Sequence, residues 1–105
     1  MKLHKFLRRQ KNSRLLIVRR VIGSSMVPTL RPGQYVVATN LFTKPNIDDV
    51  VVVKHDRVDK IKRIKDIQQG KLFLVGDNAF HSIDSRSFGW LPQNYVVGKV
   101  VWPRV

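Results

Sequence analysis

The sequence predicts an all-β fold, a small barrel or sandwich of short antiparallel strands with at most a short N-terminal helix. Three observations lead to this prediction. Runs of β-branched and aromatic residues are short, turn residues separate them at roughly 8–12-residue spacing, and no long helical pattern occurs. A length of 105 residues and a hydrophobic share of 43% fit one globular domain.

Six strands are expected, and turn residues bound each of them. The third run has four consecutive valines, which is typical of a strand buried on both faces. The fourth run partly alternates apolar and charged residues, and Gly70 follows it at a turn. A polar stretch over residues 79–94 separates the last two strands. The predicted strands are residues 15–21, 34–38, 49–55, 58–67, 71–75 and 95–102.

Two stretches between these strands are unusual. Residues 23–30 place small hydroxyl residues before a proline, which fixes the backbone, and begin with a glycine that lets another chain approach closely. Residues 76–89 crowd polar side chains into a loop long enough to carry function. Taken singly, each stretch also fits an ordinary turn whose side chains bond to the backbone.

The positive charge is concentrated in the first half of the chain. There are 20 Lys and Arg against 7 acidic residues, for a net charge of +13. Residues 1–47 hold ten of the basic residues and no acid, because the first acidic residue is Asp48. Such a segment favours an anionic neighbour, either lipid head groups or nucleic acid. A solvated basic surface explains the same charge.

The apolar runs are too short to cross a membrane. A spanning helix needs about 20 apolar residues, and a secretory signal needs an apolar stretch of about 7–15. The apolar run directly before Arg19 and Arg20 has only four residues, 15–18. We therefore expect a cytoplasmic protein without a transmembrane helix or cleaved export signal. Apolar residues share one face of any helix within the basic segment 1–14, so peripheral contact with an anionic membrane is an alternative to a frayed terminus.

The residue types present exclude several kinds of active site. The chain has no cysteine, so a disulfide framework, a thiolate zinc site and a cysteine nucleophile are excluded. It has no glutamate and no phosphate-cradling glycine loop. His4, His55 and His81 show no metal-ligand spacing, and nothing local favours a Ser-His-Asp triad. Serine paired with lysine is the nucleophilic arrangement that remains.

Lys62 is the lysine best placed to act as a base. A lysine working near neutral pH needs its pKa lowered by about three units, or roughly 4 kcal/mol. Burial and neighbouring cations can supply that change. In a strand, Lys60 and Lys62 point one way while Arg63 and Lys65 flank them in the chain. A basic edge strand that resists aggregation is the alternative interpretation of this segment.

Four segments in order resemble the conserved boxes of the signal peptidase I family. Residues 25–30, Ser-Met-Val-Pro-Thr-Leu, resemble its nucleophile box, and residues 49–53 resemble the strand box that follows. Residues 61–63, Ile-Lys-Arg, resemble the box that carries the lysine base. Residues 76–89 match the last box in residue type and spacing. The resemblance covers about residues 23–89 and implies a catalytic domain over residues 15–105.

The resemblance implies a role for five residues of this sequence. Ser25 would be the nucleophile and Lys62 the general base. Ser82 would help to orient the lysine amine, while Asp84 and Arg86 would brace the loop behind it.

The resemblance also implies substrate contacts on the nucleophile loop. The Ser25 backbone N–H would supply one oxyanion donor. Some family members add a serine hydroxyl two positions earlier, where this sequence has Gly23. Losing one such donor costs about 2.7–4 kcal/mol in activation free energy. We expect Gly23, Met26, Val27 and Pro28 to contact the substrate.

Departures from the family pattern favour one branch of it. No membrane helix is expected, the interval between Lys62 and Gly76 is short, and the last box reads Ser-Phe-Gly. These features are most similar to the nickel-type superoxide dismutase maturation proteases. That likeness implies removal of an N-terminal propeptide from a cytoplasmic precursor. Nickel would belong to the substrate, so we expect no metal or cofactor in this chain.

Three other functions remain as alternatives. The first is a signal peptidase that processes secreted precursors at a membrane. The second is a self-cleaving repressor, which would need a DNA-binding domain and an Ala-Gly or Cys-Gly cleavage site, neither of which is found. The third is a non-catalytic β-barrel that binds nucleic acid, which the scattered aromatic residues disfavour.

Overall fold

The structure is a computed structural model that describes residues 16–41 and 44–105. Within these residues seven strands form one antiparallel sheet in the order β1-β2-β7-β3-β4-β5-β6. The all-β prediction is confirmed, while the predicted segment 1–14 and its short helix lie outside the described residues. The strands are β1 (Leu16–Arg20), β2 (Tyr35–Thr39), β3 (Val50–His55), β4 (Val58–Gln68), β5 (Lys71–Val75), β6 (Leu91–Pro92) and β7 (Val96–Trp102).

Two tight hairpins set the register of the central strands. β3 and β4 are joined through Asp56 and Arg57, and His55 pairs with Val58. Both turn residues have positive φ, 53° and 65°, as a two-residue hairpin turn of the I′ type requires. β4 and β5 are joined in the same way through Gln69 and Gly70, with φ of 50° and 75°.

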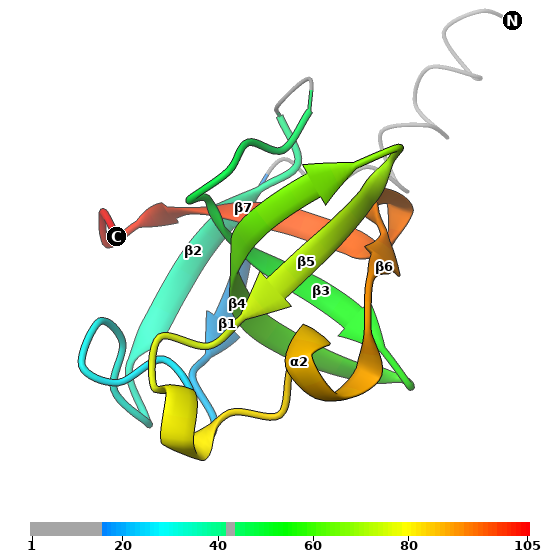
Figure 1. Ribbon diagram of the computed structural model, residues 1–105. Coiled ribbons are helices and arrows are strands. Elements are labelled where there is room, and N and C mark those ends of the chain that lie inside the picture. Colours follow the sequence, from blue (N-terminus) through cyan, green and yellow to red (C-terminus); the bar gives the residue numbers. More distant parts are fainter. Residues whose placement is uncertain (1–15, 42–43) are drawn as a thin grey trace, which may run out of the picture.

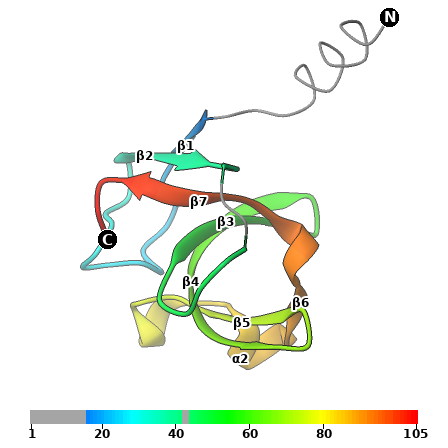
Figure 2. The ribbon, with the colours of Figure 1, turned by 90° about the horizontal axis from the view of Figure 1, so that it is seen from above.

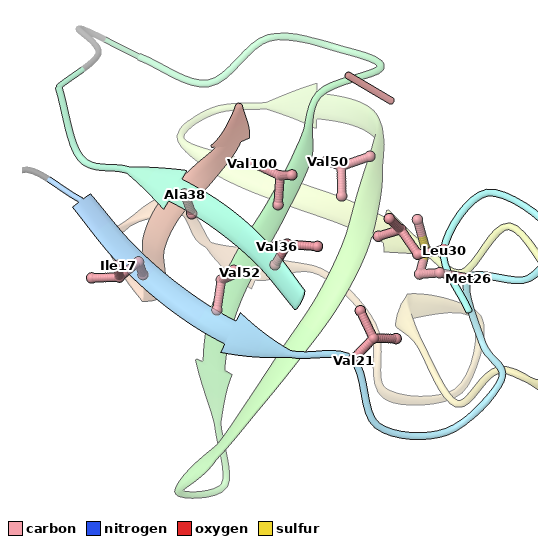
Figure 3. Packing of buried hydrophobic residues seen from close by; sticks show 9 residues of the cluster. All are labelled: Ile17, Val21, Met26, Leu30, Val36, Ala38, Val50, Val52 and Val100. Atoms are coloured by element: carbon pink, nitrogen blue, oxygen red, sulfur yellow. The ribbon is translucent and has the colours of Figure 1, made fainter. Parts of the chain in front are cut away.

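Strand β3 divides the hydrophobic interior into two clusters. Its four valines are each at most 2% exposed. Successive side chains of a strand point to opposite faces, so Val50 and Val52 join one cluster while Val51 and Val53 join the other. The expectation of a strand buried on both faces is confirmed. Figure 3 shows the first cluster, in which β1, β2 and β7 contribute the further residues Ile17, Val36, Ala38 and Val100.

The sheet curves strongly, and this curvature gathers the loops at one end. Seen from above (Figure 2), β3, β4, β5 and β6 follow a strongly curved path that bends back on itself. β1 and β2 lie on the other side of β7 from these strands. In Figure 1 the loop after β1, the 3₁₀ turn η1 (Ala79–His81) and the helix α2 (Ser85–Phe88) lie at the same end of the molecule.

Sequence patterns did not predict the short elements between β5 and β7. These are η1, α2, β6 and the 3₁₀ turn η2 (Gln93–Tyr95). Each is four residues long or shorter, which is too short to show a period of 3.6 or 2. The only local signal is at α2, where Asp84 is the N-cap and its side chain accepts a hydrogen bond from the Arg86 backbone N–H.

Candidate active site

Ser25 lies in the loop of residues 21–34 that joins β1 to β2, called here the Ser25 loop. Val21 N–H donates to the Gln34 carbonyl at 2.8 Å and Gly33 N–H donates to the Val21 carbonyl at 2.8 Å, which closes the base of the loop. Met26 and Leu30 are 1% and 0% exposed. Figure 3 shows these two side chains next to each other at one end of the first cluster. The apolar residues that flank Ser25 therefore anchor the loop.

A second segment fastens the backbone at Ser25. The Asn78 N–H donates to the Ser25 carbonyl at 2.8 Å, and the Asn78 side-chain amide donates to the Ser24 carbonyl at 3.1 Å. Gly76 fits between the two parts of the site. A Cβ added there would stand 2.6 Å from the Ser25 carbonyl oxygen and would collide with Ser82 Oγ. The close approach of these segments therefore requires glycine at this position.

The amine of Lys62 is buried and has a hydroxyl partner. Lys62 is 5% exposed and pairs with Val51 in the β3–β4 register. Its Nζ donates to Ser82 Oγ at 3.2 Å, and Ser82 Oγ donates to Asp84 Oδ2 at 2.6 Å. A serine hydroxyl has one proton to donate. Since that proton goes to Asp84, Ser82 can only accept from Lys62, which fixes the direction of the chain of hydrogen bonds.

The surroundings of Lys62 favour its neutral form. Burial lowers the pKa of the amine, because the charged form loses hydration. Asp84 acts in the opposite direction and raises this pKa, whereas Lys60 and Arg86 lower it by charge repulsion. The net effect is a pKa below the ordinary value for lysine, which is the direction that a general base near neutral pH requires.

Asp84 is a fully buried hydrogen-bond acceptor among the loops of the candidate site. Burial opposes its ionisation, yet hydrogen bonds from Arg86, Ser82 and the Gly76 N–H outweigh burial and hold the pKa of Asp84 well below its usual range. Arg86 contacts both carboxylate oxygens, at 2.9 Å through Nε and 2.5 Å through Nη2. The carboxylate thus joins the end of β5 to α2 and to the partner of Lys62.

Ser25 and Lys62 border the same groove, a cavity of about 430 Å³. The groove runs between β1, which is the first strand of the sheet, and residues 58–62 of β4, which among the described strands pair only with β3. Arg19 and Asp59 face each other across it in an ion pair of 2.6 Å. No direct hydrogen bond joins Ser25 Oγ to Lys62 Nζ in the described part of the chain. The lining residues are Arg19, Arg20, Val21, Ile22, Ser25, Met26, Val58, Asp59, Lys60, Ile61 and Lys62.

The four residues expected to contact substrate differ in position. Met26 lines the groove, although its side chain is almost fully buried. Gly23, Val27 and Pro28 lie on the same loop but outside the lining of the groove. Gly23 has φ +77°, and a Cβ added there would meet nothing within 4 Å. The space beside Gly23 is therefore open, and its contact with substrate stays a prediction.

A family comparison identifies the class of protein. Residues 58–105 match the family described as signal peptidase, peptidase S26. The chain is 30% identical to mitochondrial inner membrane protease subunit 2 of Saccharomyces cerevisiae, over 88% of the chain and 71% of that relative. The chain belongs to the peptidase S26 family. Mitochondrial ATP-independent inner membrane protease subunit 1a of Arabidopsis thaliana is 32% identical over 79% of the chain and 68% of that relative.

Membership in the S26 family confirms the signal peptidase-like resemblance at the level of the family. Signal peptidase I of Buchnera aphidicola is also 30% identical, over 63% of the chain and 21% of that relative. The matched range 58–105 includes Lys62, Ser82, Asp84 and Arg86, and begins after Ser25. None of the helices that the structure describes is long and apolar enough to cross a membrane.

One network at the candidate site was missed by the sequence reasoning. Arg63 donates to both carboxylate oxygens of Asp77, at 2.9 and 2.8 Å, and Thr29 Oγ1 donates to Asp77 Oδ2 at 2.5 Å. The hydrogen bond from Arg63 lowers the pKa of Asp77, burial opposes this, and the bond from Thr29 lowers it further. The network joins the Ser25 loop to β4 beside Lys62. Its three residues lie in the boxes of residues 25–30, 61–63 and 76–89, but the boxes did not indicate that these side chains bind one another.

The described side chains do not form a metal site. Within residues 16–41 and 44–105, no group of three or more His, Cys, Asp or Glu side chains is arranged to hold a metal ion. The acidic groups of the site, Asp77 and Asp84, are each bound to an arginine. Their interactions therefore serve to hold the loops of the site together.

Proposed function

We propose that this chain is a serine endopeptidase in which Ser25 is the nucleophile and Lys62 is the general base. One observation carries the proposal. The buried amine of Lys62 donates to Ser82 Oγ at 3.2 Å beside a groove that Ser25 also lines. A buried lysine held by a hydroxyl is a costly arrangement for a structural residue, because the amine loses its hydration and gains one neutral partner.

The arrangement around Lys62 leaves its lone pair available. A neutral amine has two N–H groups and one lone pair. One N–H is used by Ser82, whose own proton is directed at Asp84. The lone pair can then accept the hydroxyl proton of Ser25 once a substrate closes the groove, since catalytic hydrogen bonds often tighten only in the complex. Ser82 is the positioning residue in this mechanism.

The proposed reaction proceeds through an acyl-enzyme. Ser25 Oγ attacks the carbonyl carbon of the scissile peptide bond while Lys62 takes its proton. Lys62 then gives that proton to the leaving amine as the peptide bond breaks. A water molecule activated by Lys62 hydrolyses the ester and restores Ser25. The Ser25 backbone N–H supplies one donor for the oxyanion, and Gly23 stands where some relatives would have a second donor.

The substrate is proposed to bind as an extended strand in the groove. Within the described residues no strand pairs with the groove-facing edges of β1 and of residues 58–62 of β4, and an extended peptide pairs readily with such edges. Five apolar residues line the groove, so apolar side chains of the substrate are favoured. The lining includes Val21, Ile22 and Met26 from the Ser25 loop.

The substrate class proposed is a precursor protein that loses an N-terminal segment. The short interval between Lys62 and Gly76 and the Ser-Phe-Gly of the last box favour a nickel superoxide dismutase precursor. The relatives are named as inner membrane proteases and a signal peptidase, which favours a secreted or membrane-targeted precursor as the second candidate. For that second candidate, contact of the basic chain with an anionic membrane would bring enzyme and precursor together.

Incubation with purified precursors tests the proposal. Mass spectrometry would compare cleavage of a nickel dismutase precursor with that of a signal-peptide precursor. We expect Ser25→Ala and Lys62→Met to lower kcat by at least about 10⁴-fold. Ser87→Ala, on the exposed face of α2, is the matched control and should retain full activity. Full activity in Ser25→Ala or Lys62→Met would refute the dyad.

Two binding measurements address the remaining alternatives. Flotation with anionic liposomes tests membrane contact, which should weaken as salt screens the basic surface. Binding to single-stranded DNA with steep salt dependence, together with no cleavage of either precursor, would favour the non-catalytic nucleic-acid binder instead.

A further inference from the structure

Lys60 is held in a defined position beside Lys62. The two residues lie two positions apart on β4, so their side chains leave the strand on the same face. Lys60 Nζ lies 2.9 Å from His55 Nδ1 and 4.9 Å from the centre of the Phe88 ring. The ammonium group thus has a nitrogen acceptor and an aromatic face, which together restrain a side chain that is otherwise flexible.

His55 is itself fixed by packing. Its side chain is 16% exposed, and its ring centre lies 4.6 Å from that of Phe88 and 6.4 Å from that of Tyr95. Its Nε2 faces Asp56 Oδ2 at 3.7 Å. With the ring proton on Nε2, Nδ1 is free to accept from the ammonium of Lys60. The hairpin that joins β3 to β4 therefore presents a rigid acceptor to Lys60.

We propose that Lys60 is a positioning residue whose fixed positive charge keeps the amine of Lys62 in the neutral form that accepts a proton. The inference rests on the proposed function, because it concerns the same base. Because the Lys62 amine is buried and Lys60 is held on the same face of the strand, their repulsion is less screened than that between two exposed, mobile side chains.

Several other charged groups also lie near Lys62. Asp84 favours the protonated amine, whereas Lys60 and Arg86 disfavour it. Arg86 is bound to Asp84 by two hydrogen bonds, so the two charges largely offset each other. Lys60 has no carboxylate partner within the described residues, so its repulsion is not offset. The groove adds Arg20 and the Arg19–Asp59 pair, and the pair is likewise self-compensating.

The pH dependence of kcat/KM for Lys60→Met tests the inference. Removing the charge makes Lys62 easier to protonate. The acid limb of the profile, where kcat/KM falls because Lys62 becomes protonated, should therefore move to higher pH. The constant value of kcat/KM at higher pH should be unchanged. At pH values below the midpoint of this titration we expect kcat/KM to fall about 3- to 30-fold, from the repulsion of two charges carried by strand positions roughly 7 Å apart. Lys60→Arg keeps the charge and should restore most of the original profile.

Lys65→Met is the matched control. It removes the same charge from the same strand, but Lys65 is exposed. Its acid limb should stay where it is in the parent enzyme. A limb that moves equally in Lys60→Met and Lys65→Met would overturn the proposal, because net charge alone would then explain the effect. An unmoved limb in Lys60→Met would overturn it as well.

A second measurement does not depend on catalysis. The ¹⁵Nζ resonance of Lys62, followed by NMR against pH in a Ser25→Ala background, reports protonation of the amine directly. We expect its titration to move to higher pH when Lys60→Met is added. An unchanged titration refutes the coupling between the two lysines, whereas retained cleavage by Ser25→Ala refutes the proposed function. The two failures are therefore distinguishable.

Discussion

Gly76→Ala is a sharp test of the geometry around Ser25, because it adds one methyl group where two segments of the site meet. The new Cβ would stand 2.6 Å from the Ser25 carbonyl oxygen and 2.7 Å from Ser82 Cβ, and it would overlap Ser82 Oγ. Ordinary contact begins at 3.4 Å. The Ser25 carbonyl would therefore have to retreat by about 0.8 Å, in an interior that does not yield easily.

The movement separates the two halves of the proposed dyad. Ser25 is displaced on one side of Gly76, and Ser82, the partner of Lys62, is displaced on the other. A misplacement of about 1 Å costs about 10²-fold in rate, so we expect kcat/KM to fall about 10- to 100-fold. Overpacking of this kind costs about 1–3 kcal/mol in the free energy of unfolding.

Parallel activity assays and urea unfolding of Gly76→Ala and Gly70→Ala separate catalysis from stability. Gly70 lies in the β4–β5 turn with φ +75°, and a Cβ there meets nothing within 4 Å. Its substitution should cost about 1–2 kcal/mol through backbone strain and leave kcat/KM unchanged at a temperature where both variants are folded. Parent-like activity in Gly76→Ala, or an equal loss in Gly70→Ala, would refute the reasoning.

Two further predictions concern stability. Lys62→Met should raise the free energy of unfolding at pH 7 by about 1 kcal/mol or more, because it replaces a buried amine with an apolar side chain. Since the pKa of Lys62 is lowered in the fold, the unfolded chain binds more protons, and the parent protein gains stability as pH rises toward the ordinary lysine pKa. Thermal melts across pH would show this slope disappear in Lys62→Met, and an unchanged slope would contradict the burial argument. Asp84→Asn should cost about 2–3 kcal/mol at pH 7, where the carboxylate accepts from Arg86 and Ser82. Because the pKa of Asp84 is lowered, its stabilisation is present above about pH 4 and is lost as the pH falls. Denaturation series should therefore show the parent and Asp84→Asn converging in acid, and a constant difference would contradict this assignment.

Much of the fold could be predicted because its signals are local. The four-valine run of β3 indicated a strand buried on both faces, and the structure places alternate valines in separate clusters. The turn at Gly70 was visible as a glycine between two strand patterns. The elements between β5 and β7 escaped because one-turn helices and a two-residue strand carry no period, and they depend on side-chain bonds such as that of Asp84 to Gly76 N–H.

The candidate site, like the fold, could be predicted only in part from the sequence. Residue types and spacing placed Ser25, Lys62 and Ser82 in boxes of a known family, and membership in that family is confirmed. The partners of these residues were not visible. Asn78 binds the backbone at Ser25 although the two residues are far apart in the chain, and His55 contacts Lys60 across a hairpin. The number of residues between such partners does not tell how far apart they lie in the fold.

By itself, the amino-acid sequence determined the class of fold and the chemical groups on hand, because hydrophobic alternation, turn residues and box order are properties of neighbouring positions. Only the tertiary structure decided that the side chain of Lys62 is buried away from solvent, that a groove lies between β1 and β4, and that Gly76 has no room for a methyl group. Those properties arise from strand register and sheet curvature, which bring remote segments together and set the local dielectric on which a neutral lysine depends.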